Sequence, residues 1–284
     1  MVTEGLSPAT ERAPVYLDRA TERPSLTVTI KALVHYRELL RHLVIKDLKI
    51  KYRGSVLGFI WSLLNPLIMI VVYTIAFKYI VRNAQPGFVF LLLLGLLPWT
   101  AFNASLMMAT GSVLDNVGVT KSVYFPRAIL PLSTVLFNTV QYLLTIAVFL
   151  PLMMAVYHIR PAAPMLLYPV VLLLQVAFTC GLAMIIAALT VLLRDMRHLV
   201  EVGLAMLFWG TPIVYTINQV PAKLHWVIAL SPMSPYIVSY QVMFYNGQWP
   251  GLDLLVPAVV YAVAAVLIGA RVFFRLEPRF GELV

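Results

Sequence analysis

Long uncharged stretches constrain this chain more than any other feature of its sequence. Runs without a charged side chain lie at residues 56–77, 88–114, 128–158, 161–193, 202–222 and 254–270. Each of the first five exceeds the ~20 residues that an α-helix needs to cross the hydrocarbon core of a bilayer. The composition agrees, with 61% hydrophobic residues, 12% charged residues and a mean hydropathy of +0.88. The sequence therefore predicts an all-α, polytopic membrane protein.

The stretch 226–252 decides how many spans there are. It is apolar, but Pro232 and Pro235 interrupt it and polar side chains are scattered through it. Broken backbone at membrane depth is tolerated only where protein or water covers it. We therefore expect two short re-entrant helices between spans five and six, and six transmembrane helices in total. The predicted spans are about 56–80, 88–110, 128–157, 164–193, 200–218 and 252–273.

The distribution of basic residues predicts the orientation of these spans. With both termini cytosolic, all of the 21 Lys and Arg residues lie on the inner side except Lys78, Arg82, Arg160 and Lys223. This asymmetry is what the positive-inside rule requires. The net charge of +9 therefore reflects topology and contact with anionic headgroups, and not nucleic-acid binding.

The N-terminal part of the chain differs from the rest. Residues 1–25 contain several prolines and few large apolar side chains, and are predicted to be a flexible cytosolic tail. Polar residues then recur at steps of three and four, at Lys31, His35, Glu38, His42, Lys46, Lys49 and Arg53. That spacing, with apolar residues opposite, predicts an N-terminal amphipathic helix in the inner interface plane. It is either a basic anchor or a collar at the cytosolic mouth of a pathway.

The sequence argues against several classes of function. None of the twelve acidic residues lies in the middle of a predicted span, and His158, His198 and His225 fall in loops. Proton-driven transporters usually carry an intramembrane carboxylate or histidine, so proton coupling is not expected, whereas sodium coupling through backbone carbonyls stays open. Motifs for hydrolysis or phosphate binding are absent, and the single cysteine, Cys180, lies in an apolar run. The chain is not expected to be an enzyme or to hold a metal.

Five sequence blocks in a fixed order carry a resemblance to a known family. They are KDLKIKYRGSVLGFIWSLLNPL (46–67), LLGLLPWTAF (93–102), KSVYFPRAILPLS (121–133), LRDMRHLV (193–200) and TPIVY (211–215). Together they resemble the membrane subunit of ABC-2 type exporters of lipid-linked polysaccharides, such as O antigen, capsule, teichoic acid or cell-wall glycan. The resemblance implies a transmembrane domain over 26–284 in the cytoplasmic (inner) membrane. It also implies a homodimer with two copies of a separate ATPase subunit, which would carry ATP and Mg while this chain holds no cofactor.

The resemblance further assigns roles to particular residues. The loop 112–127 is similar to the coupling helix that docks on the ATPase, and residues of the next inner loop would brace that second loop against the ATPase. The residues concerned are Asp115, Lys121, Tyr124, Phe125, Arg127, Arg194 and Asp195. The basic residues Lys46, Lys49, Lys51 and Arg53 resemble the interface helix beside the point where substrate enters, and the lysines would attract a diphosphate headgroup. All of these charges equally suit plain topology signals.

A pore for a long glycan needs weak, repeated binding, which the faces and edges of aromatic rings provide. The candidates to line it are Trp61, Tyr73, Trp99, Phe102, Phe208, Trp209, Tyr215, Tyr236, Tyr240 and Phe244. Such rings also serve interface belts and helix packing. Two other functions stay open: an ABC-2 permease for a drug or lipid, and a stand-alone polyprenyl-glycan flippase. The absence of carboxylates from the spans speaks against a glycosyltransferase activity.

Overall fold

The computed structural model describes residues 36–54, 58, 60–80, 86–116, 118, 125–193, 195–216, 219–221, 223 and 225–280. Over these residues the chain forms helices and connecting segments and no strand, which confirms the all-α prediction. The predicted tail and the first residues of the amphipathic helix lie outside the described residues.

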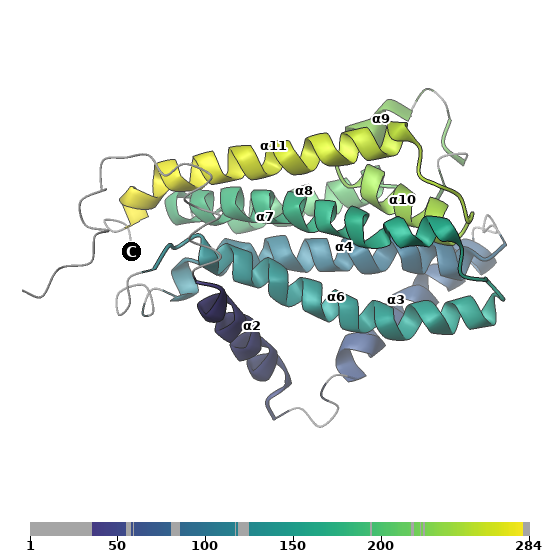
Figure 1. Ribbon diagram of the computed structural model, residues 1–284, viewed down its shortest axis with the longest axis horizontal. Coiled ribbons are helices and arrows are strands. Elements are labelled where there is room, and N and C mark those ends of the chain that lie inside the picture. The colour runs from purple at the N-terminus through teal and green to yellow at the C-terminus, as the bar shows by residue number, and fades with distance from the viewer. Residues whose placement is uncertain are drawn as a thin grey trace, which may run out of the picture.

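Within the part of the chain that the structure describes, five helical segments are long and apolar enough to cross a membrane. They are α3 (Ile60–Thr74) with the π-helical η2 (Ile75–Ile80), α4 (Phe88–Gly111), α6 (Ile129–Val156), η4 (Ala163–Leu167) with α7 (Tyr168–Leu192), and α11 (Leu252–Leu276) with η7 (Glu277–Arg279). Each overlaps one predicted span. Helices α4, α6, α7 and α11 run side by side along the long axis of the molecule (Figure 1).

The predicted span 200–218 has a different form. Helix α8 (Met196–Gly210) has 15 residues, or about 22 Å, which is less than the ~30 Å thickness of the hydrocarbon core. It ends there because Pro212 has no N–H and disfavours helical backbone at Thr211. The broken segment is held by side chains: Thr211 Oγ1 and Ser231 Oγ lie 2.7 Å apart, and Gln241 Nε2 donates to the Pro212 carbonyl at 3.0 Å.

Two short helices follow, α9 (His225–Leu230) and α10 (Ser234–Phe244). Their positions agree with the two short helices expected in this stretch. Helix α10 packs against α4, α7 and α11, and nearly all of its side chains are buried. The Tyr236 hydroxyl donates to the Ala258 carbonyl on α11 at 2.7 Å. Helix α10 is therefore part of the core of the chain.

Among the described elements, the most extensive contact is the one between α7 and α11. Small residues make this approach possible. A Cβ atom on Gly181 would lie 2.2 Å from the carbonyl carbon of Ala265, and one on Gly269 would lie 2.3 Å from the Gly181 oxygen. At this crossing the two backbones are in direct contact, so only glycine fits at either position.

Candidate functional site

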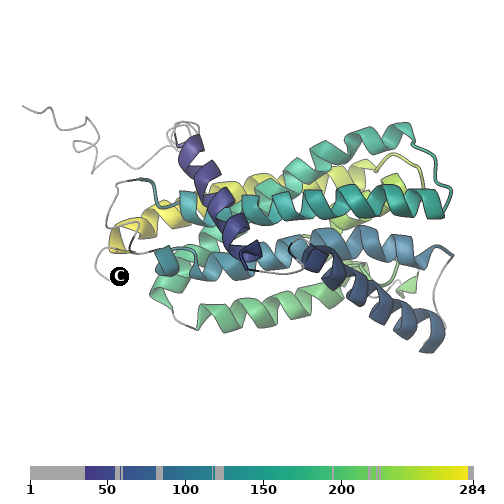
Figure 2. The same ribbon diagram turned by 90° about the horizontal axis from the view of Figure 1, so that it is seen from below.

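Helix α2 (Arg37–Tyr52) lies across the bundle and is inclined to the long helices (Figures 1 and 2). Its apolar face packs on the start of α6, where Leu43 is buried in a cluster with Phe125, Ile129 and Leu130. Tyr36, Leu39 and Leu40 pack around this cluster. The face predicted to be apolar is thus the one that docks, and the helix is fixed to the bundle by side-chain packing.

The face of α2 beside the docking face is cationic. A hollow of about 480 Å³ is lined by His42, Ile45, Lys46, Lys49, Ile50 and Arg53. Three of the four basic residues predicted to meet the substrate therefore lie on one surface. Their charges add at this surface, and such a patch raises the local concentration of anions. We call this surface the cationic hollow.

The fourth predicted residue, Lys51, lies on the other side of the helix. It follows Leu40 by eleven residues, close to three full turns, so it shares the docking face. Its amine donates a hydrogen bond to Oε1 of Gln141 on α6 and lies 5.8 Å from the ring centroid of Phe137. Burial against α6 lowers the pKa of the Lys51 amine. In this arrangement Lys51 holds α2 to α6 and does not face the cationic hollow.

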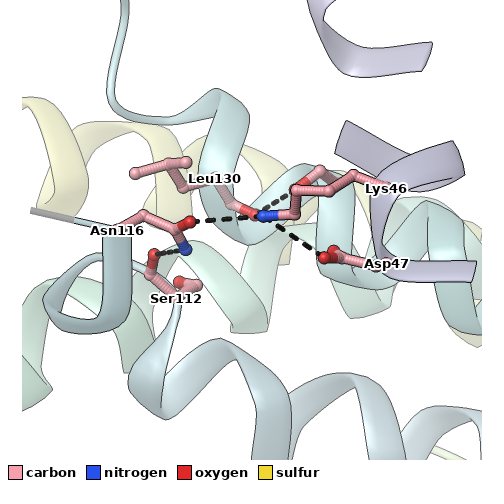
Figure 3. A network of polar contacts seen from close by, with 6 residues as sticks. Lys46, Asp47, Ser112, Asn116 and Leu130 are labelled. Atoms are coloured by element: carbon pink, nitrogen blue, oxygen red, sulfur yellow. Dashed lines mark hydrogen bonds and ion pairs between the residues drawn. The ribbon is translucent and has the colours of Figure 1, made fainter. Parts of the chain in front are cut away.

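The loop predicted to couple to an ATPase starts beside α2. The 3-10 helix η3 (Leu114–Asn116) follows α4, and Asn116 Nδ2 donates to the Ser112 carbonyl at 2.9 Å. Across from it, Lys46 Nζ donates to Asn116 Oδ1 at 3.5 Å and pairs with Asp47 at 3.4 Å (Figure 3). Asp115 is exposed next to this contact. A residue of the cationic hollow thus touches the first turn of the loop.

The other end of the loop is held more firmly. Phe125 is 6% exposed and lies under α2, so it anchors the loop and presents no docking surface of its own. The Arg127 amide donates to Oε1 of Glu277 at 3.1 Å, which ties the start of α6 to the C-terminal end of α11. Lys121, Tyr124 and Arg194 lie outside the described residues. Asp195 is exposed directly before α8, and its carbonyl accepts the His198 amide at 3.1 Å.

Several of the predicted pore rings belong to one chain of aromatic contacts. Successive centroids lie 5.5–6.0 Å apart, and the chain runs through Tyr73, Phe208, Trp99, Phe102, Phe178 and Tyr236. It crosses the bundle from α3 through α8, α4 and α7 to α10. Offset and edge-to-face ring pairs at this spacing stabilise packing.

The ten predicted rings fall into two groups by exposure. Trp99, Phe102, Tyr236, Tyr240 and Phe244 are buried in the core of this chain. Trp61 and Trp209 are 52% and 60% exposed, and Tyr73, Phe208 and Tyr215 are half-buried. The Tyr215 hydroxyl donates to the Trp209 carbonyl at 2.7 Å, which fixes these two rings to the end of α8. In this conformation, only the second group presents ring surface outside the chain.

Sequence reasoning missed four polar residues that organise these contacts. Asn116 and Glu277 hold the two ends of the loop, and Gln141 receives Lys51. Gln175 accepts from the Tyr240 hydroxyl at 2.7 Å and donates to the Pro98 carbonyl at 3.1 Å. Gln141 and Gln175 carried a readable signal, since each is an amide within an apolar run. Among the described residues, no group of three or more His, Cys, Asp or Glu side chains is placed to bind a metal.

The sequence of this chain is similar to those of known transport proteins. The family profile described as ABC-2 type transporter matches residues 38–245. The chain is 33% identical over 242 residues to the O-antigen export system permease protein RfbA of Klebsiella pneumoniae, covering 84% of this chain and 92% of that protein. It is 34% identical over 257 residues to RfbA of Myxococcus xanthus, covering 90% and 98%. A weaker similarity, 22% over 190 residues, covers 65% of this chain and 72% of the polysialic acid transport protein KpsM of Escherichia coli.

Proposed function

The chain belongs to the ABC-2 type transporter family, and from this we propose that it is the permease subunit of an ATP-driven exporter of a lipid-linked polysaccharide. The observation that carries the proposal is similarity over nearly the full length of two O-antigen export permeases, including both the helical bundle and α2. As a permease subunit, this chain would not itself catalyse a reaction. Hydrolysis of ATP, with its Mg, belongs to a separate partner subunit.

The cationic hollow is the proposed binding site for the substrate headgroup. Lipid-linked glycans carry a phosphate or diphosphate between the lipid and the first sugar, and Lys46, Lys49 and Arg53 would pair with it through charge-assisted hydrogen bonds. The inclined helix α2 holds these charges beside the start of the first long helix, which in the proposed orientation would lie at the inner interface. The glycan would enter the transporter from this side.

The proposed topology has six spans with both termini cytosolic in the inner membrane. Helix α8 would cross together with the broken segment 211–216, and α9 and α10 would be re-entrant from the outer side. In support, α2, the loop ends at Asn116 and Phe125, and the last turn after α11 all meet at one end of the bundle (Figure 1). The predicted inner basic residues concentrate in these segments.

A homodimer, with two ATPase copies, would build the pathway between protomers. Helix α3 buries only Ile70, and α8 buries only Leu204. Both helices therefore offer long apolar faces to lipid or to a second copy. If α3 and α8 face the second protomer, the exposed Trp61 and Trp209, with Tyr73, Phe208 and Tyr215 beside them, are the rings placed to meet a passing glycan.

The direct test is co-purification of this chain with the ATP-binding protein encoded beside it, followed by ATPase assay in lipid nanodiscs. The proposal expects a complex with two copies of each chain and glycan export in cells that depends on both. A folded chain that binds no ATPase would overturn the ABC assignment and favour a stand-alone flippase. Hydrolysis stimulated by a drug or phospholipid, with no effect on glycan export, would identify a different ABC-2 permease.

Charge reversal in the coupling loop provides a second test. The double variant Lys121→Glu/Arg127→Glu should insert into the membrane normally and hydrolyse ATP without exporting glycan. Export at the wild-type rate would place the ATPase contact elsewhere in the chain.

A further inference from the structure

The contact between Lys46 and Asn116 joins two parts of the molecule with different proposed tasks. Lys46 lines the cationic hollow on α2, while Asn116 closes the first turn after α4, where the loop 112–127 starts. Their side chains meet at 3.5 Å, although 70 residues separate them in sequence. This is the polar link between the hollow and the loop that Figure 3 displays.

From this geometry we infer that Lys46 senses an anionic diphosphate group in the cationic hollow and reports its presence to the loop through Asn116. The inference rests on the proposed function, because the loop must act on an ATPase. Lys46 is a positioning residue in this scheme. When the hollow holds no anion, its amine is shared between Asn116 and Asp47.

The Lys46 amine can leave Asn116 and Asp47 at little energetic cost, because both contacts are weak. The Lys46 side chain is 44% exposed, and its two partners are held at 3.5 Å and 3.4 Å. Exposed ion pairs and long hydrogen bonds of this kind are weak. A diphosphate beside Lys49 and Arg53 offers charge-assisted bonds that are shorter and stronger. Lys46 would therefore turn to the anion and release Asn116.

Release of Asn116 would act at one end of the loop and not at the other. The far end is fixed by burial of Phe125 under α2 and by the bond from the Arg127 amide to Glu277. The near end depends on Asn116, which also donates to the Ser112 carbonyl at 2.9 Å. Occupancy of the hollow would thus move the turn Leu114–Asn116 while the return of the chain into α6 stays in place.

Three variants separate sensing from binding and from local structure. Asn116→Ala removes the acceptor for Lys46 and the donor to the Ser112 carbonyl, and it leaves every charged side chain of the hollow in place. Asn116→Asp also lacks the donor to Ser112, but it keeps an acceptor for Lys46 and gives that acceptor a negative charge, so the contact with Lys46 becomes an ion pair. Lys49→Gln removes a charge of the hollow that has no contact with Asn116 among the described residues.

The experiment measures ATP hydrolysis by the complete complex in nanodiscs as undecaprenyl diphosphate is titrated. We expect Asn116→Ala to lose most of the stimulation, because Lys46 then has no link to the loop. We expect Asn116→Asp to retain the stimulation at a higher half-saturating concentration, because its carboxylate holds Lys46 more strongly than the amide does. Lys49→Gln should reach full stimulation at about fivefold higher concentration, the effect of one basic residue near an anionic surface. Inorganic pyrophosphate, added separately, shows whether the lipid is needed; stimulation by either compound supports a diphosphate site.

The outcomes separate this inference from the proposed function. Wild-type stimulation and half-saturation in Asn116→Ala would overturn the sensor role, and so would an Asn116→Asp variant that reaches half-saturation at the wild-type concentration. Stimulation by phosphatidylglycerol alone would overturn the diphosphate assignment. A wild-type complex that exports glycan without any response to diphosphate would overturn the inference while the proposed function stands. Failure to form a complex with an ATPase would overturn both.

Discussion

The backbone amide of Arg127 donates a hydrogen bond to Oε1 of Glu277 at 3.1 Å, although 150 residues separate the two in sequence. The guanidinium Nη1 of Arg127 also donates to the Glu277 carbonyl at 3.5 Å. Arg127 closes the loop 112–127, and Glu277 starts the turn after α11. The last long helix therefore sets the position at which the loop returns to the bundle.

Removing the Glu277 carboxylate should destabilise this junction. Glu277→Ala leaves the partly buried Arg127 amide without its acceptor, which costs about 1–3 kcal/mol. The free energy of unfolding in detergent measures the loss. The matched control is Glu201→Ala, because the Glu201 carboxylate pairs with His198 at 3.9 Å on an exposed surface of α8, and such pairs contribute about 0–1 kcal/mol. Equal losses of unfolding free energy in the two variants would show that the Arg127–Glu277 bond stabilises the protein no more than an exposed pair does.

The crossing of α7 and α11 makes a second prediction. Gly181→Ala places a Cβ atom 2.2 Å from the backbone carbonyl carbon of Ala265. The backbone cannot move aside as a flexible side chain can. Overpacking of this kind costs about 1–3 kcal/mol or more. We expect a lower unfolding temperature and a smaller yield of monodisperse protein.

Gly203→Ala on α8 is the control for this prediction, since nothing lies within 4 Å of its added Cβ atom. Alanine is favoured over glycine in a helix by about 0.5–1 kcal/mol, so this variant should be at least as stable as the wild type. A Gly181→Ala variant of wild-type stability would mean that the two helices lie further apart than described.

A buried hydroxyl provides the third prediction. Tyr240→Phe keeps the ring in the core but removes the donor to Gln175 Oε1, a bond of 2.7 Å between α10 and α7. An acceptor left unsatisfied in the interior costs about 1–3 kcal/mol. Thermal unfolding should detect this loss. Tyr79→Phe, at a residue that is 63% exposed, should change stability little, and a similar change in both variants would exclude a role for the Tyr240–Gln175 bond.

The long helices could be predicted from sequence because hydrophobic length is a local property. The predicted span 128–157 and α6 (Ile129–Val156) differ by one residue at each end. The predicted span 200–218 is helical only as far as Gly210, because Pro212 ends the helix there, a feature whose chemistry was readable from the sequence. Mean hydropathy averaged over a window depends only on how apolar the side chains are. It does not register that Pro212 lacks the backbone N–H that a helix needs.

The arrangement of the site could be predicted only in part. Helical periodicity placed Lys46, Lys49 and Arg53 on one face, as the structure has them, and the same periodicity would have placed Lys51 with Leu40. The sequence offers Tyr236, Tyr240 and Phe244 as candidates to line the pore because an aromatic side chain suits a pore and a core equally. Their burial in α10 depends on packing against α4, α7 and α11, which sequence spacing does not encode.

The buried Phe125 yields the last prediction, which concerns the docking of α2. Phe125→Ala removes the ring that fills the space between Leu43, Ile129 and Leu130. Loss of a buried phenylalanine costs about 3–5 kcal/mol, and here much of that cost should appear as undocking of α2. Trypsin acting on the protein in nanodiscs should then cut at Arg37, Arg41, Lys46 and Lys49 faster than in the wild type.

The expected increase in cleavage rate is at least tenfold, because proteolysis follows the population of the open form and 1.4 kcal/mol corresponds to about a factor of ten. Leu114→Ala is the control, since Leu114 is 38% exposed at the other end of the loop and lies outside the cluster. It should be cut at the wild-type rate. Equal cleavage of all three proteins would mean that α2 is held mainly by Lys51 and Gln141, which Lys51→Ala would then reveal by the same assay.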